Sequence, residues 1–386
     1  MNDPALRSLA DKLPEVGTTI FSVMSQLAAE TGAINLSQGF PDLPLDPGLI
    51  GLVHDAMREG RNQYAPMPGV PELREAIAHK VEGSYGAVYD PGTEITITAG
   101  ATQAIFTTIM ALIHPGDEVI VIDPAYDCYA PAVRLAGGTP VHVPVGADMR
   151  FDADAVRSAI GARTRMLIIN SPHNPAGRIL RGSDLQQIRQ MLAPTDILLL
   201  SDEVYEHIVF DGERHESVMR HSDLRDRSIV IFSFGKTYHG TGWKIGYVIA
   251  PAPLMKLIRK VHQFNVFSVN TPMQHALAAY MRNGSPHLQL ADLYQQKRDR
   301  FLAGARASRF DPLPCEGSYF QVMDYSRISE ENDLLFAERL AREHGVAAIP
   351  LSPFHNDTPK ERRLLRFCFA KQDHTLDLAL ERLCAI

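Results

Sequence analysis

The stretch SIVIFSFGKTYHGTGWKIGYVIAP, residues 228–251, places a lysine between two apolar runs. We predict strands over 228–232 and 247–250, with Lys236 in a short glycine-bounded bend between them. A single lysine after a strand is most often a solvated surface residue, because a buried ammonium group is costly. A functional role for Lys236 therefore depends on which side chains stand at the ends of the neighbouring strands.

The same rhythm, a short apolar run followed by a helix-like stretch, repeats from about residue 90 to 250. Most of these runs do not alternate with polar residues, which is typical of strands covered on both faces. We predict helices over 102–113 and 182–192. The fold class is therefore α/β, with a mainly parallel seven-stranded sheet built from 94–98, 118–122, 140–145, 165–169, 196–200, 228–232 and 247–250.

The pattern changes beyond about residue 285. The later part of the chain combines helix-rich, turn-rich and strand-like stretches, namely a helical segment from 286, the turn-rich PLPCEGSYFQVMDYS (312–326), a helix around 331–344, and strands in AAIPL (347–351) and LLRFCFA (364–370). We predict a large domain over 46–285 and a smaller α+β domain formed by 1–45 together with 286–386.

Composition excludes several classes of protein. The chain is 45% hydrophobic and 22% charged, with a net charge of −7 and scattered basic residues, which argues against a nucleic-acid partner or a polybasic membrane patch. No apolar run approaches the roughly 20 residues that span a bilayer, and residues 1–17 lack a signal-peptide pattern. We therefore expect a cytoplasmic protein with no membrane association.

The cysteines give no metal or redox motif. Cys128, Cys315, Cys368 and Cys384 are too far apart for C-x-x-C spacing. We expect reduced, mostly buried thiols and no metal site.

Chemically distinct side chains follow the predicted strands. Ligands of an open parallel sheet bind outside the carboxyl ends of its strands, so these residues should face one site. The set includes residues after five different strands: Ala101 and Thr102, Tyr126, Asn174, Asp202 with Tyr205, and Ser233 with Lys236.

Each residue type in this set suits part of a planar, phosphorylated heteroaromatic aldehyde. Lys236, with Lys244 as a cationic neighbour, can form a Schiff base. Asp202 can keep a pyridine nitrogen protonated, Tyr205 or Asn174 can bond the ring hydroxyl, and an aromatic ring can stack on the heterocycle.

The phosphate of such a ligand suits a helix start with hydroxyl and ammonium donors, here Ala101, Thr102, Ser233 and Lys244. Singly, each residue has a plainer explanation: Asp202 as a helix N-cap, NPAG (174–177) as a turn, and Tyr126 as core packing. Their joint occurrence at successive strand ends predicts a pyridoxal 5'-phosphate site.

Longer motifs place the chain beside a known family. NLSQGFPD (35–42), QYAPMPGVPELREAI (63–77), NSPHNPAG (170–177), SDEVYE (201–206), SFGKTYHGTGWKIGY (233–247) and LLRFCFAK (364–371) run through nearly the whole chain. The sequence resembles the class I/II (fold-type I) pyridoxal-phosphate aminotransferases. Within them it is most similar to the methionine aminotransferase and kynurenine/glutamine aminotransferase branch.

The resemblance implies a role for each motif residue. Lys236 holds the cofactor and moves the substrate proton, while Asp202 pairs with the pyridinium nitrogen. By the same resemblance, the 3'-oxygen, ring and phosphate contacts come from Tyr205, Asn174, Tyr126, Ala101, Thr102, Ser233 and Lys244. Many relatives have Arg where this chain has Lys244, so bidentate gripping is lost and the charge is kept. Tyr64 resembles a tyrosine that reaches the phosphate from the neighbouring subunit, which implies a homodimer with shared active sites.

The substrate side of the site also follows from the resemblance. Arg366 resembles the arginine that clamps the substrate α-carboxylate, helped by the backbone at Gly39 and the amide of Asn174. We assign no basic residue to a second carboxylate. Phe21 and Phe354 lie in segments that line the side-chain pocket of relatives and favour apolar, thioether or aromatic amino acids, although either can equally be a core residue.

We therefore predict a ping-pong aminotransferase that moves the amino group of an L-amino acid, such as methionine or an aromatic or glutamine-like one, to a 2-oxo acid. Kynurenine–2-oxoglutarate transamination and a β- or γ-lyase on cysteine conjugates are alternatives that share Lys236. An effector-binding module of a transcription regulator would need a DNA-binding domain before residue 35, where we expect no room. A nucleotide-binding protein would need a glycine-rich phosphate motif, and neither common form is present in a strand-to-helix setting.

Overall fold

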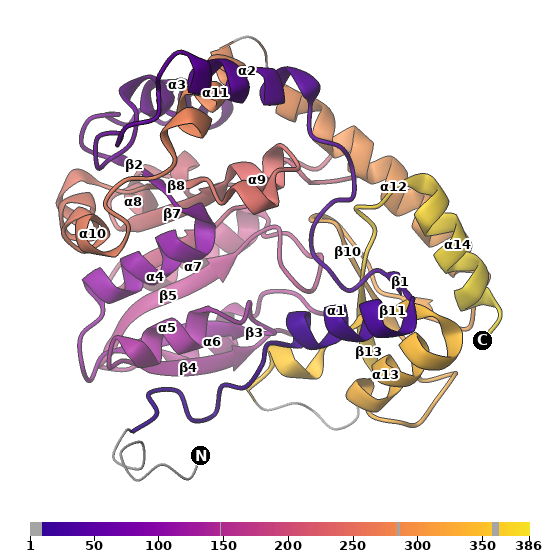
Figure 1. Cartoon of the computed structure of the whole chain (residues 1–386). Helices are drawn as coiled ribbons and strands as arrows, with labels where there is room; N and C mark the ends of the chain where they lie inside the picture. The colour runs from indigo at the N-terminus through magenta and orange to yellow at the C-terminus, as the bar shows by residue number, and fades with distance from the viewer. Residues whose placement is uncertain (1–9, 147, 283, 285, 357–362) are drawn as a thin grey trace, which may run out of the picture.

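The structure, a computed structural model, describes residues 10–146, 148–282, 284, 286–356 and 363–386 (Figure 1). Within these residues, seven strands pair into one sheet. Their spatial order is β2 (Ile95–Thr98), β8 (Gly246–Ile249), β7 (Ser228–Ser233), β6 (Leu198–Asp202), β5 (Thr164–Asn170), β3 (Glu118–Asp123) and β4 (Thr139–Pro144). All neighbours are parallel except β8, which is antiparallel to both β2 and β7. The predicted mainly parallel seven-stranded sheet is confirmed.

Helices cover both faces of this sheet (Figure 1). On one face, helical side chains pack in a single core with the strands, from α2 (Pro47–Arg58), α3 (Pro71–Tyr85), α6 (Ala153–Ala159), α7 (Gly182–Leu192), α8 (Ser222–Arg225) and α11 (Thr271–Arg282). A second core lies on the other face, against α4 (Gly100–Leu112), α5 (Tyr129–Leu135) and α10 (Ala252–Asn265).

The two cores explain why the strand sequences are continuously apolar. Along β5, Leu167 and Ile169 belong to the first core, whereas Met166 and Ile168 belong to the second. Successive side chains of a strand point to opposite faces, so a strand covered on both faces needs apolar residues at every position.

The later part of the chain forms a smaller assembly with the N-terminal segment. In the described residues, its antiparallel sheet has the order β12 (Ile349–Pro350), β13 (Leu364–Cys368), β10 (Phe320–Asp324) and β9 (Asp311–Pro312). β1 (Ile34–Asn35) pairs with β11 (Val346–Ala347). Figure 1 shows α1 (Ile20–Thr31) beside β11 and α13 (Asp333–His344), while α12 (Leu290–Ala305) and α14 (Asp373–Cys384) pack against each other. The predicted domain boundary at residue 285 lies outside the described residues.

Local predictions need three corrections. Lys236 lies on a short helix, α9 (Phe234–Thr237), rather than in an open bend. The stretch predicted to be turn-rich, 312–326, contains strand β10, which pairs with β13 along its whole length. Of the four free thiols, only Cys315 and Cys368 are buried.

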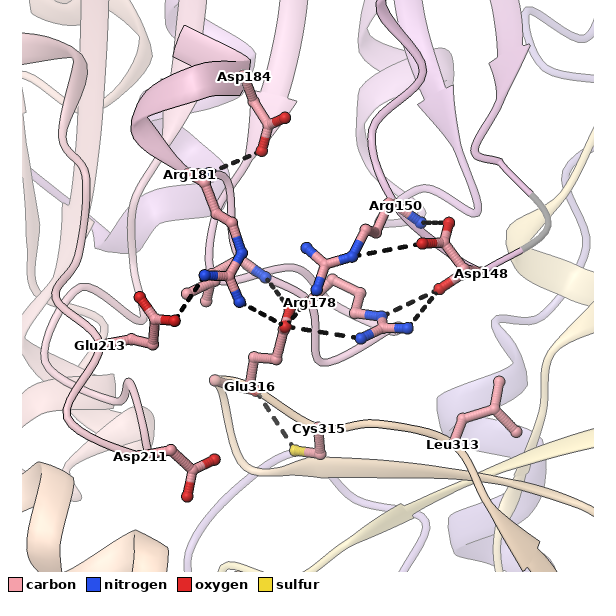
Figure 2. A network of polar contacts seen from close by, with 12 residues as sticks. Asp148, Arg150, Arg178, Arg181, Asp184, Asp211, Glu213, Leu313, Cys315 and Glu316 are labelled. Atoms are coloured by element: carbon pink, nitrogen blue, oxygen red, sulfur yellow. Dashed lines mark hydrogen bonds and ion pairs between the residues drawn. The ribbon is translucent and has the colours of Figure 1, made fainter.

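A charged cluster fastens the loop after β5 to the segment before β10 (Figure 2). The carboxylate of Glu316 accepts hydrogen bonds from Arg150 and, over 3.0 Å, from Arg181, and it lies 3.7 Å from Nη1 of Arg178. The Glu316 backbone N–H also donates to the Gly177 carbonyl over 2.7 Å. The loop that carries Asn174 is therefore held by both main-chain and side-chain contacts.

Among the described residues, no helix is both long enough and apolar enough to cross a lipid bilayer.

Candidate functional site

A cavity of ≈ 250 Å³ lies at the carboxyl ends of β5, β6 and β7. The start of α4 forms one side of it, and α1, residues 38–40, β10 and β13 close the other. Its lining consists of Phe21, Gln38, Gly39, Phe40, Gly100, Ala101, Thr102, Ile105, Tyr126, Asn170, Asn174, Asp202, Val204, Tyr205, Ser233, Lys236, Thr241, Lys244, Phe320 and Arg366. The cavity therefore lies where a parallel sheet is expected to bind its ligand.

Lys236 presents its amine to the cavity from α9. Its Nζ atom donates to the Gly39 carbonyl over 3.1 Å and lies 5.6 Å from the centre of the Tyr205 ring and 5.7 Å from that of Tyr319. Burial lowers the pKa of Lys236 to about 8. A sizeable fraction of the amine is thus neutral near physiological pH, which makes it a nucleophile and a base.

Asp202 ends β6 and is only 4% exposed. Its Oδ2 atom accepts a hydrogen bond of 2.7 Å from the Tyr129 hydroxyl, and its Oδ1 atom accepts from the Val204 N–H over 3.3 Å. Burial raises the pKa of Asp202 to about 6, although the bond from Tyr129 acts in the opposite direction. This carboxylate is poised to stabilise a cationic N–H group in the cavity.

The N-terminus of α4 provides an anion site. In the described part of the chain, no side chain caps this helix, so the first N–H groups, at Ala101 and Thr102, are left for another acceptor. Gly100 adopts a φ of +78°, and a Cβ atom there would lie 3.3 Å from Nζ of Lys244. The ammonium group thus lies beside the helix start, and Ser233 adds a hydroxyl group to the same cavity.

Arg366 is fully buried on β13. Its Nη1 atom donates to Oδ1 of Asn174 over 2.8 Å, and its Nη2 atom donates to the Ser37 carbonyl over 2.9 Å. The guanidinium carbon lies 4.0, 5.3 and 5.4 Å from the ring centres of Phe320, Phe21 and Phe354. Burial lowers its pKa to about 10, so it stays cationic at neutral pH. Among the described residues its Nε atom has no partner, and a carboxylate is the natural acceptor.

Twelve of the predicted site residues line this one cavity: Phe21, Gly39, Ala101, Thr102, Tyr126, Asn174, Asp202, Tyr205, Ser233, Lys236, Lys244 and Arg366. Two do not. Phe354 is buried and packs edge-on against Phe21, with their ring centres 5.7 Å apart. Tyr64 lies on the surface with 81% of its side chain exposed, against Phe267.

Sequence reasoning missed several residues that shape the site. Tyr129 bonds Asp202, and Tyr319 donates to the Gly39 carbonyl over 2.7 Å. Asn170 lines the cavity and accepts from the Asn174 N–H over 2.8 Å. Asn170 directly follows the predicted strand 165–169, so the rule that identified Asp202 could have found it. Tyr319 and Phe320 were hidden in the stretch predicted to be turn-rich.

Known proteins are similar to this chain over nearly its whole length. Residues 31–383 match the aminotransferase class I and II family. Methionine aminotransferase of Escherichia coli is 50% identical over 374 residues, which are 96% of this chain and 97% of that protein. A probable N-succinyldiaminopimelate aminotransferase of Mycobacterium tuberculosis is 38% identical over 97% of this chain and 98% of the relative. Human kynurenine–oxoglutarate transaminase 3 is 34% identical over 96% of this chain and 89% of its own length.

The similarity extends to three dimensions. A solved Escherichia coli structure, for which a methionine aminotransferase function was identified, has a TM-score of 0.96 with this chain at 48% identity. The match covers 98% of this chain and 99% of that one. Sheet, cavity and smaller assembly are thus all included in the matched region.

Proposed function

This chain belongs to the class I and II aminotransferases, and on that premise we propose that its cavity binds pyridoxal 5'-phosphate and accepts L-methionine as an amino donor. The resemblance read from the motifs is confirmed. The protein is a transaminase, an enzyme whose substrates are an amino acid and a 2-oxo acid. The cofactor contacts and the donor preference are the parts proposed.

One observation carries the cofactor proposal: the same cavity holds a lysine amine of lowered pKa, a buried carboxylate and an uncapped helix start beside an ammonium group. These donors fit the aldehyde, the pyridine nitrogen and the phosphate of this cofactor. Pyridoxal phosphate, when bound, supplies an electron sink for the bonds of the substrate α-carbon.

Different residues of the chain hold the cofactor and transfer the proton. Asp202 holds a proton on the pyridine nitrogen, and Lys236 carries the proton to and from the substrate α-carbon. The α4 N-terminus with Thr102, Ser233 and Lys244 holds the phosphate.

Arg366 orients the substrate through its α-carboxylate. The bonds from Nη1 to Asn174 and from Nη2 to Ser37 leave the second N–H of each of these nitrogens and the unpartnered Nε for this purpose. Three aromatic rings hold the guanidinium group in place and exclude water around it.

The donor preference rests on the lining and on the relatives. Phe21, Phe40 and Phe320 give the cavity an apolar side. Its cations, within the described residues, are Lys236, Lys244 and Arg366, all of which already have a role, so none remains for a second carboxylate. Methionine suits this lining and is the substrate named for the 50% identical relative. The same aromatic lining favours kynurenine as a second candidate, the substrate named for the human relative.

We also propose a homodimer with shared active sites. Tyr64 is 81% exposed and packs edge-on against Phe267, with ring centres 5.3 Å apart. Phe264, near the end of α10 and three residues before Phe267, is 87% exposed. Exposed aromatic clusters of this kind are typical of protein interfaces, and a second copy would bring Tyr64 toward its neighbour's cavity.

The test is a titration of purified protein with pyridoxal 5'-phosphate, followed by borohydride reduction and peptide mass spectrometry. We expect one labelled peptide, modified at Lys236. Lys236→Ala should lose the label and lower turnover of methionine by about 10³-fold or more. Label at another lysine, or appreciable turnover by the variant, would contradict the assignment of Lys236.

Donor preference is tested separately by comparing kcat/KM for methionine, kynurenine and glutamate with one 2-oxo acid. We expect methionine and kynurenine to exceed glutamate. Release of pyruvate and ammonia from a cysteine conjugate without any 2-oxo acid would instead show lyase activity.

A further inference from the structure

We propose that Tyr129 is a positioning residue of the transamination: its buried hydroxyl group orients the Asp202 carboxylate and keeps it ionised for the pyridine nitrogen of the cofactor. The inference rests on the proposed binding of pyridoxal 5'-phosphate. Tyr129 does not line the cavity within the described residues, so it acts through Asp202.

Separate contacts hold the side chain and the main chain of Asp202. The Tyr129 hydroxyl, at the start of α5, lies 2.7 Å from Oδ2 of Asp202, and the two residues are 3% and 4% exposed. The Asp202 main chain is held separately, because its carbonyl accepts from Nδ2 of Asn170 over 2.8 Å and from the Ser171 N–H over 3.1 Å. Asn170 and Ser171 thus hold the backbone of Asp202, while the Tyr129 hydroxyl group and the Val204 N–H hold its carboxylate.

Tyr129 also supports the ring proposed to stack on the cofactor. Its ring packs edge-on against Tyr126, with centres 5.8 Å apart and planes at 73°. Tyr129 therefore contacts both Tyr126, the ring proposed to stack on the cofactor, and Asp202, the carboxylate proposed to face the pyridine nitrogen. A change confined to the hydroxyl group should affect only the second of these.

The hydroxyl group of Tyr129 opposes the effect of burial on the pKa of Asp202. Burial raises the pKa of Asp202, and the hydrogen bond from Tyr129 is the strongest of the influences that lower it. The titratable and charged groups that face Asp202 are Tyr126, Cys128, Tyr129, Glu203, Tyr205 and Lys236. Burial raises the pKa of the Tyr129 phenol well above its usual value, so it remains a hydrogen-bond donor throughout the working pH range.

The test is Tyr129→Phe, which keeps the ring and removes the hydroxyl group. The full-length protein, stripped of cofactor and titrated with pyridoxal 5'-phosphate, gives a dissociation constant at each pH. We expect the constant to rise about tenfold or more near pH 7. The ratio to wild type should shrink toward pH 9, where Asp202 is ionised with or without the hydroxyl group.

Tyr325→Phe is the matched control, because it removes another buried hydroxyl group that donates to the Glu331 carbonyl over 2.9 Å, in the smaller assembly. It should leave the dissociation constant unchanged at every pH. The Asp202→Asn background supplies the second check: there, Tyr129→Phe should add no pH-dependent loss.

The outcomes separate this inference from the proposed function. Wild-type protein that fails to bind the cofactor would refute the proposed function itself. Wild type that binds, with a Tyr129→Phe variant that binds equally well or is weaker by the same factor at every pH, would overturn the inference and leave Tyr129 as a packing residue. An undiminished pH-dependent loss in the Asp202→Asn background would overturn it as well.

Discussion

Nη1 of Arg366 and Oδ1 of Asn174 lie 2.8 Å apart, and this hydrogen bond joins β13 to the loop after β5. The same loop is held by Glu316 through the Gly177 carbonyl. Arg366, which we propose binds the substrate carboxylate, is thus positioned by a loop of the larger assembly, although it belongs to the smaller one. Because Nη1 of Arg366 is a donor, the atom of Asn174 that it contacts is the acceptor oxygen of the amide.

Arg366→Lys should keep a positive charge and lose the planar fork. A lysine can replace one of the bonds to Asn174 and Ser37 but cannot make both while also binding a carboxylate. We expect KM for the amino acid and the 2-oxo acid to rise by about 10- to 100-fold, as measured by steady-state kinetics of both half-reactions. Arg342→Lys, at an exposed pair with Glu338, is the control. Unchanged KM values in Arg366→Lys would place the carboxylate elsewhere.

Asp202→Asn should stabilise the protein stripped of cofactor above about pH 6. The pKa of Asp202 is raised by burial to about 6 in the folded state, against about 3.9 when unfolded. A raised carboxyl pKa contributes stability that is fully present below the unfolded pKa and lost as the pH rises through the folded pKa. Urea unfolding at pH 8 should therefore show the variant more stable by about 2 to 3 kcal/mol.

The internal control for this prediction is the low-pH limit. Near pH 3.5 the two proteins should unfold at similar urea concentrations, since Asp202 is then protonated in both states. A stability difference that does not change between pH 3.5 and pH 8 would show that the carboxylate carries no electrostatic cost.

Glu316→Gln should destabilise the fold by about 1 to 3 kcal/mol. The side chain of Glu316 is only 15% exposed. Removing its negative charge leaves Arg150, Arg178 and Arg181 without the carboxylate that they share (Figure 2). Urea unfolding measures the loss, which higher salt should reduce. Glu338→Gln breaks an exposed i,i+4 pair and should cost about 0.5 kcal/mol or less. Equal effects of the two variants would contradict a special role for the Glu316 cluster.

The large sheet was predictable because most of its strands are continuous apolar runs bounded by polar or glycine residues. Asp202 and Lys236 could be chosen as site residues because each follows a predicted strand, which needs no knowledge of tertiary contacts. β10 was missed because Gly317 and Ser318 stand shortly before it, separated from it only by Tyr319, and Ser318 adopts a left-handed φ of 63°. Such residues indicate a turn more strongly than the short run Phe320–Asp324 indicates a strand.

Tyr129 escaped for a different reason. Its partner Asp202 is 73 residues away along the chain, and in the sheet β5 lies between β6, which carries Asp202, and β3, which precedes the helix that begins at Tyr129. A phenol after an aromatic motif has the composition of ordinary core packing, and only the tertiary fold shows where its hydroxyl group points. Contacts of this kind depend on the order of strands, which a single sequence does not contain.

Phe264→Ser tests the proposed homodimer. The side chain is 87% exposed in the single chain and stands three residues before Phe267, which contacts Tyr64, so a second copy that covers it would lose apolar contact area in the variant. Sedimentation velocity at micromolar concentration should show a dimer for wild type and a shift toward monomer for the variant. The monomer should bind pyridoxal 5'-phosphate more weakly, because Tyr64 would no longer reach a neighbouring cavity. Leu378→Ser, on α14 and 48% exposed, should leave the sedimentation unchanged. A wild-type protein that sediments as a monomer would refute the shared site and leave Tyr64 without a ligand.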